Sequence, residues 1–423
     1  MSTNHIAYNS FSARKFQFAR EAAFVFTILA ALLWAFPARL AAQGELLNEE
    51  ELATKETYES LARALQEPDK VYKLDLTYTS TKKLPPRFSE LKNLQVLILN
   101  NNPLVELPAN IGDFKNLQVL SASTCLLKTI PKSIGKLQNL VALAIAQNPI
   151  QSFPKELGNC KNIRTLDLKA TRIKGELPAF IANLSNLMIL GVERNQITKI
   201  PAFIGKIPYL WQLDVSNNKL TTLPAEMKNL EYLSDLDLSL NNFTAIPEAL
   251  TTSPNLHQLI LDENPIQTWS ANLKNLKRLK VLSIANGKFT TFPKEICGFD
   301  SLLILKAKHN RFEGLPKEIG QLKLLRSLDV SYSEIKDLPV EIGELKDLRE
   351  LLLTFNELAS LPAEIGTLEN LAILNVTNNR LSSLPPELSK LARLAEAKIS
   401  GGNKIKPEDL ERLKAALPSA YIE

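Results

Sequence analysis

Apolar residues recur along most of this chain with a period of 23 residues, and this pattern predicts both the elements and their number. From Val71 onward each unit has the form L-x-x-L-x-L-x-x-N-x-L-x-x-L-P, and a single step of 24 residues interrupts the period. Such self-similarity is typical of solenoids, in which each unit buries its apolar face against the next. The fifteen units begin at Val71, Leu94, Leu117, Leu140, Ile163, Leu187, Leu210, Leu233, Leu256, Leu279, Leu302, Leu325, Leu348, Leu371 and Leu394.

Within one unit, alternating apolar and polar residues predict a short strand. Leu213 and Val215 are expected to point inward and Asp214 outward, because successive side chains of a strand alternate between its faces. Asn218 then stands at the turn, where its amide can bond backbone groups that leave the sheet. Nine units keep this Asn, and the other six have Thr79, Cys125, Thr171, Gly287, Ser333 and Gly402 at the equivalent position.

A Leu-Pro step and an Ile-Gly pair mark the returning half of most units. Pro224 fixes φ and suits the first turn of a helical segment. Gly135 and Gly205 follow an inward apolar residue and suit a helix C-terminus. Each unit is therefore expected to contain one strand and one short returning helix.

Stacked units of this kind predict an α/β solenoid, a curved horseshoe of about 15 repeats. The parallel sheet is expected on the concave face, and short helices or 3₁₀ turns on the convex face. We assign residues 71–401 to the repeat array and residues 402–423 to a C-terminal cap with a helix from Pro407 to Leu417. Residues 43–70 are assigned to an N-terminal helical cap, because Tyr58, Leu61 and Leu65 have helical spacing.

The 23-residue unit with Leu-Pro-x-x-Ile-Gly resembles the leucine-rich repeats of the Ras-binding and scribble-like scaffold proteins and of the plant intracellular Ras-group repeat proteins. The resemblance covers residues 71–405, and it implies a protein-interaction scaffold. The cap phrases at residues 64–71 and 415–418 are similar to those of exported repeat proteins of environmental bacteria. Partner identity does not transfer with either resemblance.

Residues 1–42 have the order of parts of a signal peptide: Arg14, Lys15 and Arg20 precede an apolar run from Ala22 to Phe36, and small residues follow. The run is shorter than the about 20 residues that a membrane-spanning helix needs. We therefore expect cleavage after Ala42 and export to the periplasm, the cell envelope or the extracellular space. The alternative is an uncleaved anchor over residues 22–40, which would hold the protein on a membrane.

Charge and chemistry narrow the functional classes. A formal net charge of +5, much of it in the leader, does not predict nucleic-acid binding. Three cysteines stand too far apart in the repeat register to pair, so we expect free thiols. The chain has only three histidines, His5, His257 and His309, and no phosphate-binding loop. We expect no catalytic residues, no metal and no cofactor.

One group of acidic residues on the expected inner curve forms a first candidate site. Asp167, Gly191, Asp214, Asp237 and Ile260 should share one column, with neighbours about 4.8 Å apart. Repulsion between these like charges would favour a cationic partner or Ca²⁺, and the alternative is a strand face screened by solvent. The acidic patch comprises Glu193, Asp214, Asp235, Asp237, Asp262 and Glu263.

A second candidate site lies further along the same face, where aromatic and aliphatic side chains are rimmed by charges. Exposed aromatic residues in such surroundings are typical of protein contacts. The alternative is that the aromatic rings pack on one another across neighbouring strands. This mixed patch comprises Lys306, Lys308, His309, Tyr332, Glu350, Leu352 and Phe355.

These observations predict a non-catalytic scaffold that binds a protein partner, of unknown identity, on its concave face. The alternatives are a carbohydrate-binding or cell-envelope-binding structural protein and a membrane-anchored signalling scaffold. Sugar binding would favour tryptophan on the inner curve, whereas Trp211 stands near the start of a strand and Trp269 in a returning loop. Protein is therefore the favoured partner.

Overall fold

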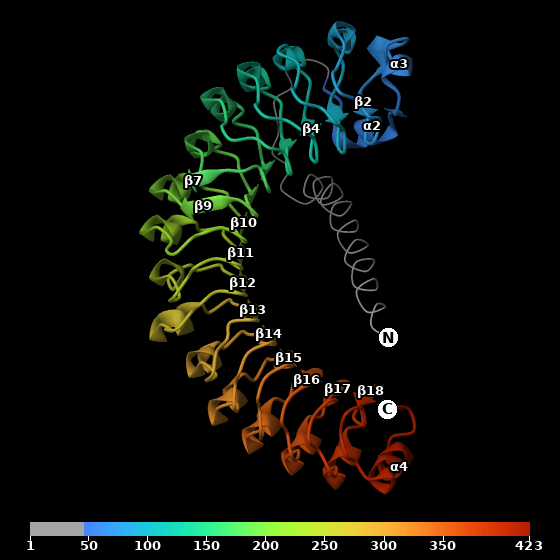
Figure 1. Ribbon diagram of the computed structural model, residues 1–423, viewed down its shortest axis with the longest axis vertical. Helices are drawn as coiled ribbons and strands as arrows, with labels where there is room; N and C mark the ends of the chain where they lie inside the picture. Colours follow the sequence, from blue (N-terminus) through green and yellow to red (C-terminus); the bar gives the residue numbers. More distant parts are fainter. Residues whose placement is uncertain (1–45) are drawn as a thin grey trace, which may run out of the picture.

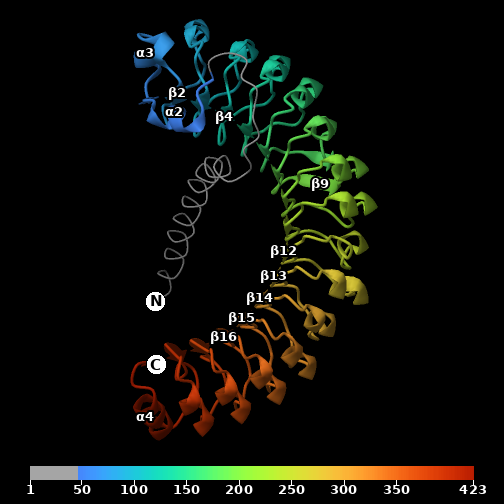
Figure 2. The same ribbon diagram turned by 180° about the vertical axis from the view of Figure 1, so that it is seen from behind.

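The computed structural model describes residues 46–423, which form one continuous arc (Figure 1). The same arc is seen from behind in Figure 2. The expected signal peptide and its cleavage after Ala42 lie outside the described residues. No helix of the described chain combines the length and the apolar character that crossing a membrane requires.

Short parallel strands line the inner curve and form one sheet of 17 strands. Neighbouring strands pair in constant register, as Leu213 does with Leu236 and Leu236 with Leu259. Apart from the first and last strands, each belongs to one of the fifteen expected repeats, so the predicted horseshoe is confirmed. The strands are β1 (Thr57–Tyr58), β2 (Lys73–Asp75), β3 (Val96–Ile98), β4 (Val119–Ser121), β5 (Ala142–Ala144), β6 (Thr165–Asp167), β8 (Ile189–Gly191), β10 (Gln212–Asp214), β11 (Asp235–Asp237), β12 (Gln258–Ile260), β13 (Val281–Ser283), β14 (Ile304–Lys306), β15 (Ser327–Asp329), β16 (Glu350–Leu352), β17 (Ile373–Asn375), β18 (Glu396–Lys398) and β19 (Tyr421–Ile422).

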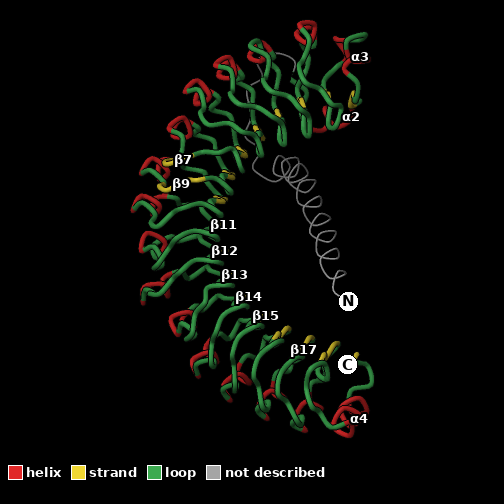
Figure 3. The backbone as a smooth tube through the Cα atoms, viewed as in Figure 1, coloured by secondary structure: helices red, strands yellow, loops and turns green. Residues whose placement is uncertain are grey.

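The returning segments are 3₁₀ helices on the outer curve (Figure 3). Each has five residues or fewer, too short for a stable α-helix, and proline precedes or begins most of them. They are η1 (Pro68–Lys70), η2 (Pro86–Glu90), η3 (Ile111–Asp113), η4 (Lys132–Lys136), η5 (Lys155–Asn159), η6 (Ala179–Asn183), η7 (Ala202–Lys206), η8 (Ala225–Asn229), η9 (Glu248–Leu250), η10 (Ala271–Asn275), η11 (Lys294–Gly298), η12 (Lys317–Gln321), η13 (Val340–Glu344), η14 (Ala363–Thr367) and η15 (Pro386–Lys390).

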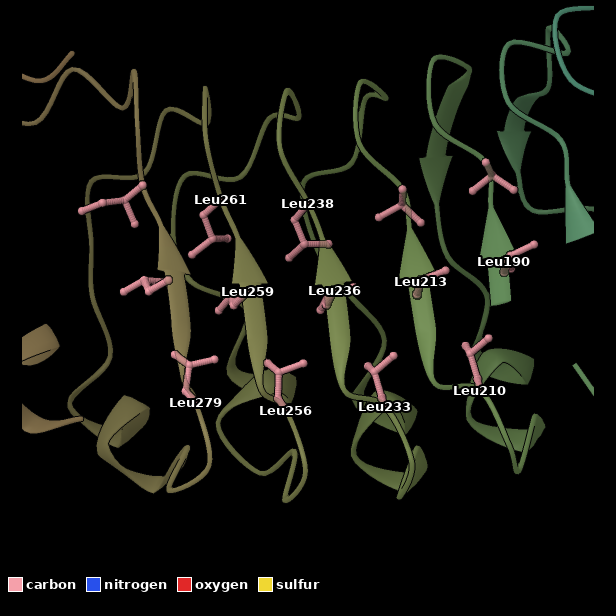
Figure 4. Packing of buried hydrophobic residues seen from close by; sticks show 14 of the residues in the cluster. Leu190, Leu210, Leu213, Leu233, Leu236, Leu238, Leu256, Leu259, Leu261 and Leu279 are labelled. Atoms are coloured by element: carbon pink, nitrogen blue, oxygen red, sulfur yellow. The ribbon is translucent and has the colours of Figure 1, made fainter. Parts of the chain in front are cut away.

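Between strands and 3₁₀ helices, equivalent leucines stack from repeat to repeat and form the core (Figure 4). Leu210 and Leu213 are fully buried, as are Leu233 and Leu256 to within 1%. No repeat could bury these side chains alone, so each depends on its two neighbours for the hydrophobic contribution to stability.

Separate elements cover the two ends of the sheet. At the N-terminal end lie α2 (Glu49–Thr54), β1 and α3 (Leu61–Ala64), and at the C-terminal end α4 (Pro407–Ala416) and β19. Tyr58, expected in a helix with Leu61, lies instead in β1, which pairs with β2. Its side chain is buried and its hydroxyl contacts Glu67 at 3.2 Å, so the residue closes the edge of the sheet instead of presenting a helical face.

Buried asparagines at the turn after most strands form an asparagine ladder. In Asn241, Nδ2 donates to the carbonyl groups of Val215 and Leu238, both at 3.0 Å. Its Oδ1 accepts from the Leu220 N–H at 2.9 Å. One side chain thus satisfies backbone groups of its own repeat and of the preceding one, as the sequence predicted for Asn218 and its equivalents.

Two positions of this ladder were expected to hold glycine, and the structure differs at one of them. The final repeat uses Asn403, not Gly402, since Asn403 donates to Val376 and accepts from the Leu381 N–H at 3.0 Å. Gly402 has a φ of +75° and belongs to the turn itself. At Gly287 an added Cβ would overlap the ring of Phe289 unless that ring shifted, and Phe289 packs against Trp269 with centroids 5.5 Å apart.

The glycines of the Ile-Gly pairs have a different role from the helix-ending one that we expected. Gly135 lies inside η4 and is absent from the residues with positive φ. A Cβ added to Gly135 would overlap the backbone carbonyl of Glu156 in the next repeat, and Gly205 faces Glu226 in the same way. Glycine is therefore required by the close approach of neighbouring 3₁₀ helices.

An extra residue widens one unit of the array. Gly175, with a φ of +77°, lies in β7 (Lys174–Glu176), which pairs in parallel with β9 (Gln196–Lys199) away from the inner curve (Figure 1). The three cysteines, Cys125, Cys160 and Cys297, are buried and unpaired, which confirms the expected free thiols.

We predict that Gly135→Ala lowers the free energy of unfolding by about 1–3 kcal/mol, since the methyl group has no space between neighbouring repeats. Thermal and urea denaturation will measure the change. Gly314→Ala is the matched control, because nothing lies within 4 Å of its added Cβ and its φ is ordinary. Equal stability of the two variants would contradict the close-approach role.

Candidate functional site

The concave face is built from side chains that alternate with the buried leucines along each strand. Strand register places Asp167, Gly191, Asp214, Asp237 and Ile260 in one column, as predicted. Asp214 and Asp237 are therefore direct neighbours on adjacent strands. Like charges so placed on a half-buried surface repel each other more strongly than they would in water.

Each of these two aspartates is held by the turn that follows it. Oδ1 of Asp214 accepts from the Ser216 N–H at 2.9 Å and from its hydroxyl at 2.6 Å. Oδ1 of Asp237 makes the same two bonds with Ser239. The carboxylates are thus fixed in position, with Oδ1 engaged in the turn.

The remaining members of the acidic patch surround this pair. Glu193 forms an ion pair with Lys169 at 3.0 Å, and Oδ1 of Asp262 accepts from the Ser283 hydroxyl at 2.6 Å. Asp235 lies two residues before Asp237 in β11. Glu263 is exposed at the turn after β12.

Burial makes this surface costly for charged carboxylates. Burial, with repulsion from Asp214, raises the pKa of Asp237 to about 6. Burial and the same Asp214 raise the pKa of Glu193, although Lys169 opposes the rise. Burial raises the pKa of Asp262, which Lys306 and Lys308 oppose. The patch is therefore an environment in which an added cation would stabilise the charged forms.

Asp167 also belongs to this surface, although the acidic patch predicted from the sequence does not include it. Burial and repulsion from Glu193 raise its pKa to about 7. Its place in the column was visible in the sequence, but its burial was not. Among residues 46–423 no group of three or more His, Cys, Asp or Glu side chains has the arrangement of a metal site.

The turn after each strand places one residue in the left-handed region of backbone conformation. From Asn101 to Asn378 these residues have φ between 51° and 58°, and their N–H groups donate to a carbonyl of the next repeat. Asparagine tolerates this conformation well, whereas bulky side chains are rare in it. Asn217 and Asn286 are further examples of the favoured type.

Three successive repeats place an aromatic ring at this same position. His309 and Tyr332 stack with centroids 4.2 Å apart, and Tyr332 and Phe355 stack at 4.6 Å, both with interplanar angles of 18°. We name these three residues the aromatic stack. Tyr332 remains 43% exposed and Phe355 45% exposed, so their packing on one another leaves a broad face open to solvent.

The other members of the mixed patch lie on the strands beside the stack. Lys306 is exposed and pairs in register with Asp329, which in turn neighbours Leu352. Lys308 is exposed next to His309, and Glu350 accepts a hydrogen bond from Ser327. The structure thus brings all seven residues onto one continuous surface, with the aromatic rings along its rim.

Models of leucine-rich repeats match three stretches of the chain. The model of a leucine-rich repeat region matches residues 132–218, and that of the repeats of leucine-rich repeat and WD repeat-containing protein 1 matches residues 198–297. The single leucine-rich repeat matches residues 370–391. No curated protein shows significant similarity to this chain.

Solved structures include similar proteins over most of the chain. A leucine-rich repeat protein of Leptospira interrogans is 35% identical with a TM-score of 0.79, covering 87% of this chain and 99% of that one. The leucine-rich repeat ectodomain of a plant membrane receptor kinase from Arabidopsis thaliana, in complex with Casparian strip integrity factor 2, is 30% identical with a TM-score of 0.57.

The alignment to that ectodomain covers 81% of this chain but 46% of the receptor chain. The Drosophila Toll protein in its complex with Spatzle shares the fold, at 21% identity and a TM-score of 0.69, over 80% of this chain and 48% of that one. This chain therefore spans less than half the length of either receptor chain.

We predict that Asp237→Asn stabilises the protein at pH 8 but not at pH 4. The pKa of Asp237, about 6 when folded, exceeds the unfolded value of about 3.9, so folding favours the protonated form. That contribution is present below about pH 4 and is lost as the pH rises through about 6. The substitution should therefore add up to about 3 kcal/mol at pH 8, since the pKa shift is about two units and each unit corresponds to about 1.4 kcal/mol.

Denaturation at both pH values measures this difference. Asparagine keeps the turn bonds, because Asn375 makes the same two bonds to Thr377 in an equivalent position. Asp329→Asn is the matched control, since Asp329 pairs in register with Lys306 and Leu352 and not with another carboxylate. A gain of the same size at pH 4 would show that charge is not its cause.

Proposed function

Since this chain belongs to the leucine-rich repeat protein family, we propose that it is a non-catalytic scaffold whose concave face binds a segment of another protein. The observation that carries the proposal is the aromatic stack. Its three side chains occupy a backbone conformation that bulky residues rarely adopt, and they expose their rings on the inner rim. A run of three neighbouring exposed rings is a candidate for a protein contact.

The composition of the surrounding surface supports a protein partner. Aromatic rings flanked by Lys306, Lys308 and Glu350 combine apolar area with charges at the margin, as in the energetic centres of protein interfaces. The acidic patch adds a region suited to cationic side chains of the same partner. In the similar plant receptor kinase ectodomain, the structure holds a complex with another protein.

We further propose that the protein is exported and that its leader is removed after Ala42. The order of basic, apolar and small residues over residues 1–42 supports this, and the similar Arabidopsis protein is an ectodomain. Export would give the concave face access to partners outside the cytoplasm.

The binding proposal predicts that the double substitution Tyr332→Asn and Phe355→Asn lowers the affinity for the partner by at least about tenfold. The reason is that truncating a central aromatic contact costs more than about 1 kcal/mol of binding free energy. The partner is first trapped by benzoylphenylalanine placed at Phe355 in the producing cell, with the exposed convex Val340 as the control position. Affinity is then measured by calorimetry. A covalently attached protein is expected only from position 355.

The asparagine substitutions also separate binding from folding. Asn378 occupies the same left-handed position, so the variant should melt at the same temperature as the parent or higher. Tyr78→Asn is the matched control, since Tyr78 is an exposed aromatic residue with φ of 60° in the first repeat. Unchanged affinity of the double variant, or a large fall in its melting temperature, would contradict the proposal.

The export proposal predicts a mature protein that begins at Gln43, recovered from the envelope or the medium. Mass spectrometry of the protein purified from each cell fraction measures its N-terminus. Ala42→Pro should block processing and leave the leader attached. An intact Met1 in the untreated membrane fraction would instead support anchoring by residues 22–40.

A further inference from the structure

A row of half-buried asparagines runs along the edge where the chain enters about half of the strands. These residues precede the first leucine of their units and donate from Nδ2 to a backbone carbonyl of the preceding repeat. Asn139 donates to Lys115 at 2.8 Å, and Asn255 donates to Glu231 at 2.6 Å. We name this the surface asparagine row, whose bonded members include Asn93, Asn116, Asn139, Asn162, Asn255 and Asn370.

Two neighbouring repeats in the middle of the array have tyrosine at this position, and other repeats have Arg278, Ser301, Leu324, Asp347 and Arg393. Tyr209 and Tyr232 stand at the asparagine position, are 50% and 55% exposed, and contact each other with ring centroids 6.0 Å apart. Tyrosine lacks the amide that bonds the preceding repeat. The chain therefore forgoes two bonds between repeats and exposes two rings at one place.

A third exposed aromatic side chain lies close to Tyr209 in sequence. Trp211 follows the buried Leu210, two residues after Tyr209, and is 44% exposed (Figure 4 labels Leu210). Within the described chain, neither tyrosine hydroxyl nor the indole N–H forms a hydrogen bond with another residue. We name Tyr209, Trp211 and Tyr232 the aromatic triad, and its polar atoms are free for a partner.

The repeats that carry the triad also carry the centre of the acidic patch. Asp214 lies in β10, after Tyr209 and Trp211 in the chain, and Asp235 and Asp237 lie in β11, after Tyr232. The backbone joins the two features, since the Asp235 N–H donates to the Trp211 carbonyl at 3.1 Å. Exposed aromatic rings and carboxylates thus occur on the same two consecutive repeats.

From this juxtaposition we infer that the aromatic triad and the aspartates of the same repeats form the docking site for an arginine-bearing segment of the protein partner. A guanidinium group stacks on aromatic faces and also pairs with a carboxylate through two parallel hydrogen bonds. Lysine offers only a point charge and matches this surface less well. The inference rests on the proposed function and adds the chemistry of the partner to it.

Calorimetry of the full chain with hexa-arginine and hexa-lysine at physiological salt tests the inference. The parent should bind hexa-arginine more tightly than hexa-lysine. The double substitution Tyr209→Asn and Tyr232→Asn should lower the affinity for hexa-arginine by about tenfold, which is equivalent to the loss of one or two cation–π contacts. The same variant should melt no lower than the parent, because the substitutions restore the asparagine row.

Charge removal gives the second arm of the test. The double substitution Asp214→Asn and Asp237→Asn should also lower the affinity for hexa-arginine. The control variant, Glu364→Gln with Glu387→Gln on the convex 3₁₀ helices η14 and η15, should leave this affinity unchanged. Equal binding of the two peptides, or no effect of the tyrosine substitutions, would overturn the inference. So would binding of chitohexaose that requires the triad while hexa-arginine does not bind, since that outcome assigns the triad to a carbohydrate.

The partner trapped at Phe355 separates this inference from the proposed function. If binding of that partner is weakened by the aromatic-stack variant (Tyr332→Asn with Phe355→Asn) but not by the triad variant (Tyr209→Asn with Tyr232→Asn), the scaffold function stands and the arginine site is wrong. If the triad variant weakens the partner and the aromatic-stack variant does not, the arginine site is supported and the carrying observation of the proposed function is overturned.

Discussion

The asparagine ladder is the interaction on which the rest of the structure depends. Strands of only three residues leave many backbone groups without partners at the turn that follows, where water does not reach. A single amide such as that of Asn241 accepts from one repeat and donates to two, which fixes the distance and the register between units. With that register set, the leucines meet in the core and the outward side chains align in columns. The concave surface is therefore a consequence of a buried hydrogen-bonding network.

The period predicted the fold because every unit solves the same packing problem with the same residue types. It did not give the reason for the glycines, since a contact with the next repeat, as between Gly135 and Glu156, depends on the spacing of the outer helices. It also misplaced the last turn at Gly402, because an unequal final unit shifts the amide to Asn403 by one residue. The local sequence pattern determines which elements each unit contains, whereas the close approach of neighbouring units determines where individual residues depart from that pattern.

The candidate site was predictable to a similar extent. Column alignment follows from a constant period, so the neighbours Asp214 and Asp237 could be placed from the sequence alone. The left-handed backbone of Tyr332 and the burial of Asp167 could not, since both depend on the path of the chain after the strand and on what covers it. The tyrosines that interrupt the surface asparagine row give a signal that a comparison of equivalent positions across the units would have found.

Contacts in this solenoid join each repeat to its immediate neighbours. Energetic coupling in such a linear array falls off along the chain, and substitutions several units apart contribute nearly additively. The triad near β10 and the aromatic stack near β15 are separated by intervening repeats, so either surface can change its chemistry without disturbing the other. Selection can therefore change the residues that contact a partner in one repeat at a time, while the scaffold keeps its stability.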